Sequence, residues 1–266
     1  MAYLDVTQVN AMTTSQMAAL TTSQAGALGT DQAAALTGTQ LAAISTQDIA
    51  VLSTAAVSSL ALAAVPKLTS TQFNSLTTAQ VAALTTAQIV ELVTAQAAGM
   101  GTLQAAALTS TQVAAMEVPD LSKLNTSALA ALTTSVIGNL DARQVAGMTT
   151  TQVAALTTTQ AAALGSVQSA ALTGNQVAVV TTSDLINFST VALSAIDLLV
   201  VPKLTSNQLN SLNSTQVVSL TTDQIVALST SQAASLGTLQ AASLTSSQVV
   251  AMDGGDLGKP NTAAFS

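Results

Sequence analysis

An eight-residue unit, repeated without interruption, constrains this chain more than any other feature. Segment 76–83 reads Leu-Thr-Thr-Ala-Gln-Val-Ala-Ala, and the next unit begins at Leu84. In this register the chain from Leu4 to Ser266 divides into 33 octads, the last one residue short, with no insertion or deletion between them. A phase kept over this length predicts one continuous repeat array rather than one or two ordinary domains.

The octad has the pattern of a short capped helix. Position 2 is Thr, Ser, Gly, Asp or Asn in 30 of the 33 octads, and these residues are preferred at a helix N-cap. Position 5 is Gln in 22 octads, which is the spacing of a capping box. Apolar residues at positions 1 and 6 would form the hydrophobic staple around that cap, and Ala at positions 7 and 8 favours helix. The pattern predicts one very short helix in each octad.

Other arrangements of the octad are less favourable. In a continuous α-helix each octad would advance the apolar row by about 80°, so no stable apolar face would form. In a flat strand Leu, Thr, Gln and Ala would share one face, and neither face would be a core. A β-solenoid is the runner-up, because the period is even, but the high Ala content disfavours it. We therefore predict an all-α solenoid of short capped helices, curved into a superhelix.

A longer period divides the array into two similar copies. The sequence Ala-Val-Pro-Lys-Leu-Thr at 64–69 returns as Val-Val-Pro-Lys-Leu-Thr at 200–205, which is 17 octads later. We predict a first array copy at 1–136 and a second at 137–266, continuous with the first.

The Gln row is interrupted at regular intervals by trios of octads, in which position 5 carries another residue. These position-5 residues are Asp48, Ala56 and Ala64; Asp120, Ala128 and Val136; Asp184, Ala192 and Val200; and Asp256 and Ala264. Pro66 and Pro202 fall inside the expected helices of two trios and predict a changed local geometry, because proline stops an α-helix. Pro119 falls in a first turn, where it is tolerated.

Four of the five basic residues also lie in the trios. One hypothesis pairs these lysines, Lys67, Lys123, Lys203 and Lys259, with the aspartates at position 5 of the trios, Asp48, Asp120, Asp184 and Asp256. The alternative is that all these charges are solvated, and exposed pairs would contribute only about 0–1 kcal/mol each.

Charge and hydropathy narrow the possible partners. The net charge is −7 with five basic residues, so no basic stripe exists to neutralise phosphates, and we expect no nucleic-acid partner. Thr and Gln interrupt every apolar run, so we expect no membrane insertion. The start of the chain, Met1-Ala2-Tyr3-Leu4-Asp5, shows no cleaved signal peptide. The absence of Cys is compatible with an extracellular protein and with many cytosolic proteins.

The sequence offers little chemistry for catalysis. With no His and no Cys, most general-base, nucleophile and zinc constellations are missing. The Ser and Thr residues mark helix caps. The acids Glu117 and Asp120 are close in sequence, as are Asp253 and Asp256, but neither pair has the surrounding pattern of a calcium loop. We expect no catalytic residue, no metal site and no cofactor, and hence no enzyme.

The tandem units at 76–83 and 148–155 resemble repeat tracts of very large repetitive bacterial proteins, often described as surface, adhesin-like or secreted proteins. The resemblance covers essentially the whole chain and implies an extracellular or cell-surface location. Neither terminal octad is notably more polar than the interior ones, so we expect uncapped ends. Either the chain is a segment of a longer array, or its copies self-associate, end to end or laterally. The expected function is a structural, filament-forming module. The alternative is an adhesive or ligand-binding surface, including ice binding through the Thr rows at positions 2 and 3.

Overall fold

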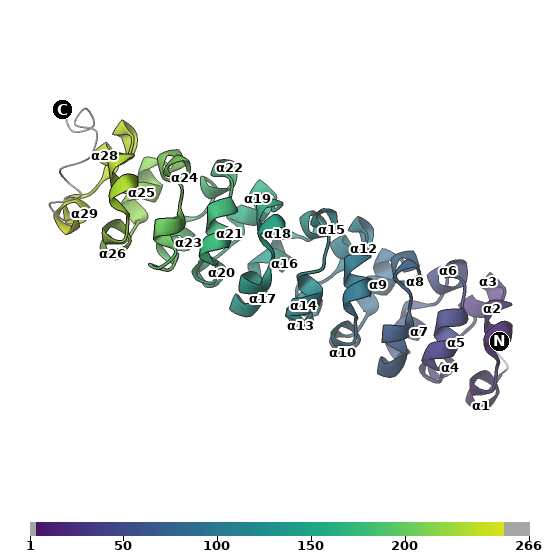
Figure 1. Ribbon diagram of the computed structural model, residues 1–266. Coiled ribbons are helices and arrows are strands. Elements are labelled where there is room, and N and C mark those ends of the chain that lie inside the picture. Colours follow the sequence, from purple (N-terminus) through teal and green to yellow (C-terminus); the bar gives the residue numbers. More distant parts are fainter. Residues whose placement is uncertain (1–3, 253–266) are drawn as a thin grey trace. The chain divides into compact units, whose positions relative to one another are not determined.

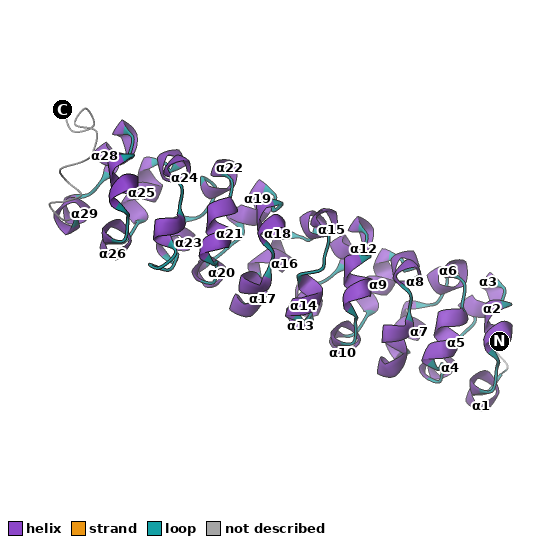
Figure 2. Cartoon of the chain, in the orientation of Figure 1, coloured by secondary structure: helices purple, strands orange, loops and turns teal. Residues whose placement is uncertain are grey.

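The computed structural model describes residues 4–252, and these form short helices joined by short turns (Figures 1 and 2). Each complete octad from Leu4 to Ala251 contains one helix of three to six residues. The predicted all-α solenoid of very short helices is confirmed. The β-solenoid is wrong, because residues 4–252 contain no strand.

The chain divides into two compact units, Met1–Val136 and Ile137–Ser266. The helices of the first unit are α1 Val6–Asn10, α2 Thr14–Ala18, α3 Thr22–Gly26, α4 Thr30–Ala34, α5 Gly38–Ala43, α6 Thr46–Ala50, α7 Thr54–Ser59, the 3₁₀-helix η1 Leu62–Lys67, α8 Ser70–Ser75, α9 Thr78–Ala83, α10 Thr86–Val90, α11 Thr94–Ala98, α12 Thr102–Ala107, α13 Ser110–Ala115, α14 Val118–Leu121 and α15 Thr126–Ala131. Helix α16, Thr134–Gly138, includes the boundary residues.

The second unit continues with the same kind of element. Its helices are α17 Ala142–Gly147, α18 Thr150–Ala154, α19 Thr158–Ala162, α20 Ser166–Ala170, α21 Gly174–Val179, α22 Thr182–Leu185, α23 Thr190–Ser194, the 3₁₀-helix η2 Val201–Lys203, α24 Ser206–Ser211, α25 Ser214–Ser219, α26 Thr222–Val226, α27 Thr230–Ala234, α28 Thr238–Ser243 and α29 Ser246–Ala251.

The helices begin as the capping pattern predicts. At α9 the N–H of Gln80 donates to Oγ1 of Thr77 at 3.2 Å, and the N–H of Thr77 donates to Oε1 of Gln80 at 2.7 Å. The same reciprocal pair of hydrogen bonds recurs at most helices whose N-cap residue has an oxygen in its side chain, including α1 and α29. Where the N-cap is Val93, the side chain cannot accept a hydrogen bond, but the N–H of Val93 still donates to Gln96. These bonds satisfy N-terminal amides that a helix leaves free.

Each helix ends before the position-1 residue, usually Leu, that opens the next octad. At the end of α9 the N–H of Leu84 donates to the carbonyl of Val81 at 3.1 Å, and Leu84 then takes an extended conformation (φ −57°, ψ 135°). Leu84 and Val81 are both buried, like Leu76 at the start of the same octad. Positions 1 and 6 therefore supply the core, as predicted.

Within each unit a helix packs against the helix three octads away. In the first unit α9 contacts α12 and α12 contacts α15, and in the second unit α20 contacts α23 and α23 contacts α25. Burying one Leu and one small apolar residue per octad cannot offset the entropy of ordering eight residues, so stacking between turns is required for folding.

The prolines of the trios change the local geometry as predicted. Pro66 lies in η1 and Pro202 in η2, both 3₁₀-helices where neighbouring octads form α-helices. Proline has no N–H and clashes with the preceding turn of an α-helix. The more tightly wound 3₁₀-helix therefore forms in place of the α-helix. Pro119 lies in the first turn of α14 and leaves that helix intact.

Candidate functional site

The position-5 Gln makes a second set of hydrogen bonds, which links one turn of the solenoid to the turn before it. Nε2 of Gln80 donates to the carbonyl of Leu52 at 2.7 Å and to that of Ile49 at 2.9 Å, residues 28 and 31 positions earlier. The Ile49 carbonyl is at the end of α6, and Leu52 immediately precedes the cap of α7. One turn therefore takes between three and four octads.

The link from Nε2 to the position-1 carbonyl 28 residues earlier has a length of 2.6–3.0 Å wherever the structure gives it within a unit. The donors are Gln32, Gln40, Gln72, Gln80, Gln88, Gln96, Gln104 and Gln112 in the first unit, and Gln168, Gln176, Gln208, Gln216, Gln224, Gln232, Gln240 and Gln248 in the second.

These Gln side chains are buried, with exposed fractions of 1–8%. A buried amide must be hydrogen-bonded, and in most of these octads Oε1 accepts from the cap while Nε2 donates to the previous turn. The sequence pattern predicts a role for this Gln in the cap alone. The regular recurrence of Gln at position 5, next to the apolar position 6, was a signal that its side chain could be buried. The carbonyls that it binds could not be predicted, because they lie 28 and 31 residues earlier in the chain.

The trio octads with Ala at position 5 have more extensive helix contact in place of the Gln link. Each trio spans three octads, which is about one turn, so the Gln link is interrupted around one turn. Within the units, the helix pairs with the most extensive contact are α4 with α7, α5 with η1, α12 with α15 and α20 with α23. The second helix of each pair belongs to a trio octad with Ala at position 5, and each of these alanines is buried. A side chain without bulk lets the two backbones approach, which a Gln would prevent.

Asn side chains supply further contacts between turns. In α15, where position 5 is Ala128, the N-cap Asn125 donates from Nδ2 to the carbonyl of Met100 at 2.9 Å. Met100 lies 28 residues before Ala128, so Asn125 contacts the carbonyl that a Gln would have reached. In α8 Asn74 donates to the carbonyl of Gly99 and accepts from the N–H of Gly101 at 2.8 Å.

The same Asn contact recurs in the second unit, and it explains a glycine. Asn210 donates to the carbonyl of Ser235 at 2.8 Å and accepts from the N–H of Gly237 at 2.8 Å. A Cβ at Gly237 would lie 2.8 Å from Oε1 of Gln240 and 3.4 Å from Oδ1 of Asn210. A Cβ at this N-cap would require the ends of these two side chains to shift, and glycine lets both keep their present positions.

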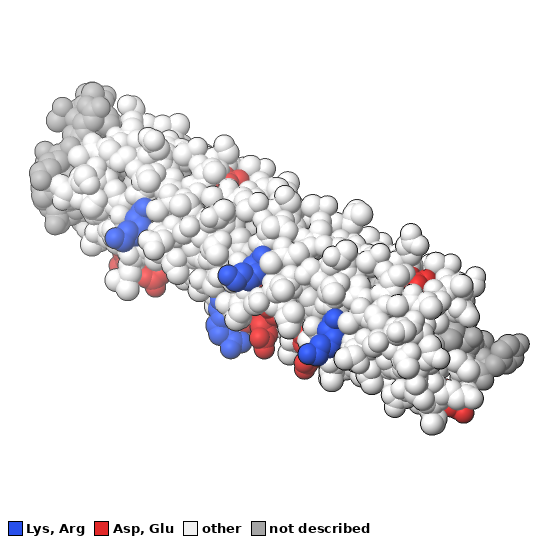
Figure 3. All heavy atoms as spheres, turned by 45° about the vertical axis from the view of Figure 1, so that its right-hand side comes forward, with Lys and Arg blue, Asp and Glu red and all other residues white. Residues whose placement is uncertain are grey.

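The trio lysines do not pair with the trio aspartates. Within residues 4–252 the only ion pair joins Arg143 to Asp141, so the pairing hypothesis is wrong for Lys67, Lys123 and Lys203. Lys259 and Asp256 lie outside the described residues. The lysine stems pack instead: a Cβ at Gly174 would lie 2.8 Å from Cγ of Lys203, and Gly38 and Lys67 make the equivalent contact. Figure 3 shows how few charges the visible face carries.

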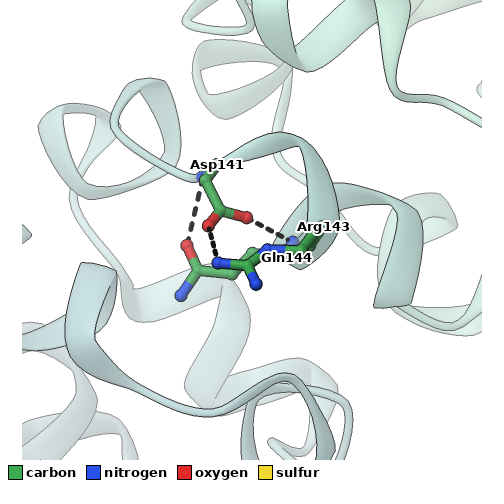
Figure 4. Close-up of polar contacts among 3 residues, drawn as sticks. All are labelled: Asp141, Arg143 and Gln144. Carbon is green, nitrogen blue, oxygen red and sulfur yellow. Dashed lines mark hydrogen bonds and ion pairs between the residues drawn. The ribbon is translucent and has the colours of Figure 1, made fainter.

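The Arg143–Asp141 pair lies on the surface at the start of α17 (Figure 4). Nη2 of Arg143 donates to Oδ2 of Asp141 at 3.4 Å, and the side chains are 88% and 48% exposed. Oδ1 of Asp141 accepts from the N–H of Gln144 at 2.8 Å. This backbone hydrogen bond, followed by the Arg143 charge, lowers the pKa of Asp141 below its ordinary value. Asp141 is a helix cap with a weak ion pair, which is a structural role.

Three of the trio aspartates, Asp48, Asp120 and Asp184, are buried, with exposed fractions of 3–5%. Ser45 donates from its hydroxyl to the carboxylate of Asp48 at 2.7 Å, and Thr181 donates to that of Asp184 at 2.6 Å. Asp120 follows Glu117 instead of a hydroxyl. Burial, and then the negative charge of Glu117, raise the pKa of Asp120. Asp253 and Asp256, the other acid pair, lie outside the described residues.

Between residues 4 and 252 no three His, Cys, Asp or Glu side chains are grouped where they would hold a metal ion. An apolar cavity of about 10 Å³ lies between Leu193, Val201, Leu209 and Gln224, and its volume is at the lower limit for one water molecule. None of the helices in this part of the chain is both long enough and apolar enough to span a bilayer.

The two Thr rows differ in their availability. At position 2 the hydroxyls of Thr77 and Thr85 accept hydrogen bonds from the backbone of their own helices. At position 3 the residues Thr78 and Thr86 are exposed. All four residues are exposed, but the hydroxyls of Thr78 and Thr86 take no part in the caps.

Comparison with known proteins identifies the repeat. The ALTTAQ repeat matches residues 1–38, 65–94, 113–150 and 201–230, which together make up just over half of the chain. The chain belongs to the ALTTAQ repeat family. No curated protein and no solved structure matches it. In this ALTTAQ repeat protein the Leu, Thr and Gln of the motif are the core anchor, the helix cap and the link between turns, so it is a structural repeat module.

Proposed function

We propose that this ALTTAQ repeat protein is a self-associating, filament-forming scaffold, part of a large bacterial protein. The supporting observation is the interface between its turns. Each turn directs Gln amides toward the turn before it and offers backbone carbonyls to the turn after it. Such a head-to-tail interface does not close on itself, so one more turn can always be added.

The scaffold would not be an enzyme. Without His or Cys, the chain lacks the side chains that most often act as general base or nucleophile. Its position-2 hydroxyls are engaged in capping, as at Thr77 and Thr85. The buried Gln side chains are hydrogen-bonded within the fold. The protein would therefore act by binding other molecules or other copies of itself, not by catalysis.

Electron microscopy of the purified chain over a wide range of concentrations tests the scaffold, with far-ultraviolet circular dichroism of the same samples. Filaments that lengthen with concentration and retain a helical spectrum are expected. Uniform single particles at every concentration would contradict self-association and favour a binding role.

A binding surface is the second candidate, favoured by the exposed position-3 threonines such as Thr78 and Thr86. Regularly spaced hydroxyls and methyl groups suit a repetitive ligand such as ice or a crystalline polymer. Thermal hysteresis of a monomeric sample would support ice binding. Freezing behaviour identical to that of a buffer with an inert protein would contradict it.

We also propose an extracellular or cell-surface location, based on the resemblance to repetitive bacterial surface and secreted proteins. Fractionation of the native host with an antibody against the chain is the test. Recovery of the protein only from the cytosol would contradict this location.

A further inference from the structure

An exposed apolar patch occurs once in each unit, around the 3₁₀-helix that contains a proline. Leu62 of η1 and Leu198 of η2 are each 44% exposed, whereas most leucines in residues 4–252 are buried. In the helices of the next turn, Val90 is 42% exposed and Val226 is 54% exposed. We call these surfaces the proline patches, and each also contains one basic and one acidic residue. They consist of Leu62, Pro66, Lys67, Val90 and Glu91 in the first unit, and of Leu198, Pro202, Lys203, Asp223 and Val226 in the second.

The hydrogen bonds between turns place each 3₁₀-helix beside the helix that carries the exposed valine. Nε2 of Gln88 in α10 donates to the carbonyl of Leu60, which opens the octad of η1. Nε2 of Gln224 in α26 donates in the same way to the carbonyl of Ile196, which opens the octad of η2. Each patch is therefore built from two successive turns of the solenoid.

The register between turns shows which side chains meet within a patch. Position 3 of one helix lies next to positions 4 and 8 of the helix three octads later. Oγ of Ser110, at position 3, is 3.1 Å from Oγ of Ser135 at position 4, and Oγ of Ser206 is 2.8 Å from Oγ of Ser235 at position 8. In this register the position-3 leucine of each patch lies next to the acidic residue of the same patch.

The two charges of a patch lie on opposite sides of its apolar centre. The stem of Lys67 packs against Gly38 of the previous turn, and that of Lys203 packs against Gly174. The acidic residues lie instead on the helix of the next turn. Within residues 4–252 no ion pair involves the lysine or the acid of either patch. The order along the solenoid is therefore lysine, leucine with proline, and acid, with both charges available to a partner.

A second copy of the chain offers the complement of this order. When two proline patches meet face to face with their solenoids antiparallel, the lysine of each faces the acid of the other. The apolar residues then face each other at the centre. Such a contact about a two-fold axis satisfies both charges of both copies. A parallel arrangement would place lysine against lysine, and a partner of a single charge sign would satisfy only one of the two groups.

We propose that the proline patches are lateral docking sites for a second copy of this chain in antiparallel orientation. Lys67 of one copy would pair with Glu91 of the other, and Leu62 and Pro66 would be covered. A stable interface buries about 800 Å² on each partner, more than these few side chains supply, so a single patch should bind weakly. Two patches in one chain strengthen an assembly through avidity. This inference rests on the proposed self-association and specifies a lateral interface for it.

Two charge-reversal variants of the full chain test this pairing. The acidic variant carries Lys67→Glu and Lys203→Glu, and the basic variant carries Glu91→Lys and Asp223→Lys. When either variant meets itself, like charges face each other on both sides of every patch. A mixture of the two variants restores opposite charges, so only the mixture should associate as the wild type does.

The matched control is Lys123→Glu with Arg143→Glu. It changes the net charge as much as the acidic variant does, at exposed basic residues outside the patches. Circular dichroism verifies that all the proteins are folded, and sedimentation velocity over a range of concentrations measures their association.

We expect the wild type, the control and the mixture to associate alike. Each variant alone should associate at least ~10-fold more weakly, because every contact loses two opposite-charge pairs and gains two like-charge pairs. A mixture that associates no better than its components, or a control weakened as much as the acidic variant, would overturn this interface but not self-association. A wild type that stays monomeric at every concentration would overturn both.

A second measurement needs no variant. A carbodiimide joins a lysine amine to a carboxylate with which it is in contact. In an equimolar mixture of ¹⁵N-labelled and unlabelled chains, mass spectrometry should find Lys67 joined to Glu91 in peptide pairs of which one is labelled and the other is not. Links of Lys67 that are confined to pairs of a single label would overturn the contact between copies.

Discussion

Nε2 of Gln80 lies 2.7 Å from the carbonyl oxygen of Leu52, although 28 residues separate them in the chain. The same side chain accepts the N–H of its own helix cap at Thr77. One amide therefore starts a helix and binds that helix to the previous turn. This double role makes Gln the residue on which both the local and the long-range structure depend.

Replacing Gln80 by Glu separates the two roles. The variant keeps the capping oxygen but loses the donor to Ile49 and Leu52 and buries a carboxylate beside their carbonyls. We expect a loss of about 2–5 kcal/mol in the free energy of unfolding, measured by urea unfolding followed by circular dichroism. Ala79→Glu, at the exposed neighbouring position, should unfold at nearly the wild-type urea concentration. Similar midpoints for the two variants would show that the link contributes little.

Restoring Gln to a trio should be unfavourable. Ala56 is fully buried where α7 approaches α4 closely, so Ala56→Gln would overpack the contact and destabilise the protein by about 1–3 kcal/mol. Ala55→Gln, one residue earlier and exposed, is the control and should be nearly neutral. Thermal unfolding of both proteins decides the matter. If Ala56→Gln stabilised the protein, the trio would merely lack the hydrogen bond from Gln to the previous turn, and the packing around Ala56 would not require a small side chain.

Ser169 occupies a core position, and its hydroxyl has no hydrogen-bond partner. Leaving a buried hydroxyl unsatisfied costs about 1–3 kcal/mol, so Ser169→Ala should stabilise the protein by roughly that amount, less the small loss of packing. Ser166→Ala, in the same helix but exposed, should change stability little. Chemical unfolding of the three proteins is the measurement. Destabilisation by Ser169→Ala would reveal a partner for the hydroxyl.

The raised pKa of Asp120 predicts how the stability of the protein depends on pH. Its pKa is raised in the folded protein by burial and by Glu117, so its ionised form reduces stability at neutral pH. This cost disappears as the pH falls through the raised pKa and the group takes up a proton. Asp120→Asn should therefore stabilise the protein at pH 7, and the difference from wild type should shrink toward acid. A difference that stays constant across a urea-unfolding pH series would contradict this account.

The capping, the short helices and the identity of the core positions could be predicted from the sequence. The reason is that these features arise within eight residues. Thr77 and Gln80 are three positions apart, and a hydrogen bond at that distance depends only on local backbone geometry. The effects of Pro66 and Pro202 were predictable for the same reason, since proline acts on its own turn of helix.

The contacts between turns were decided by the tertiary structure. Whether Nε2 of Gln80 reaches Leu52 depends on the number of octads per turn, which the packing of neighbouring helices sets. The same packing brings Ala56 into close contact and places the stem of Lys203 over Gly174 rather than beside an aspartate. These contacts join residues more than 20 positions apart. A pattern that repeats every eight residues carries no information about which of its copies will meet.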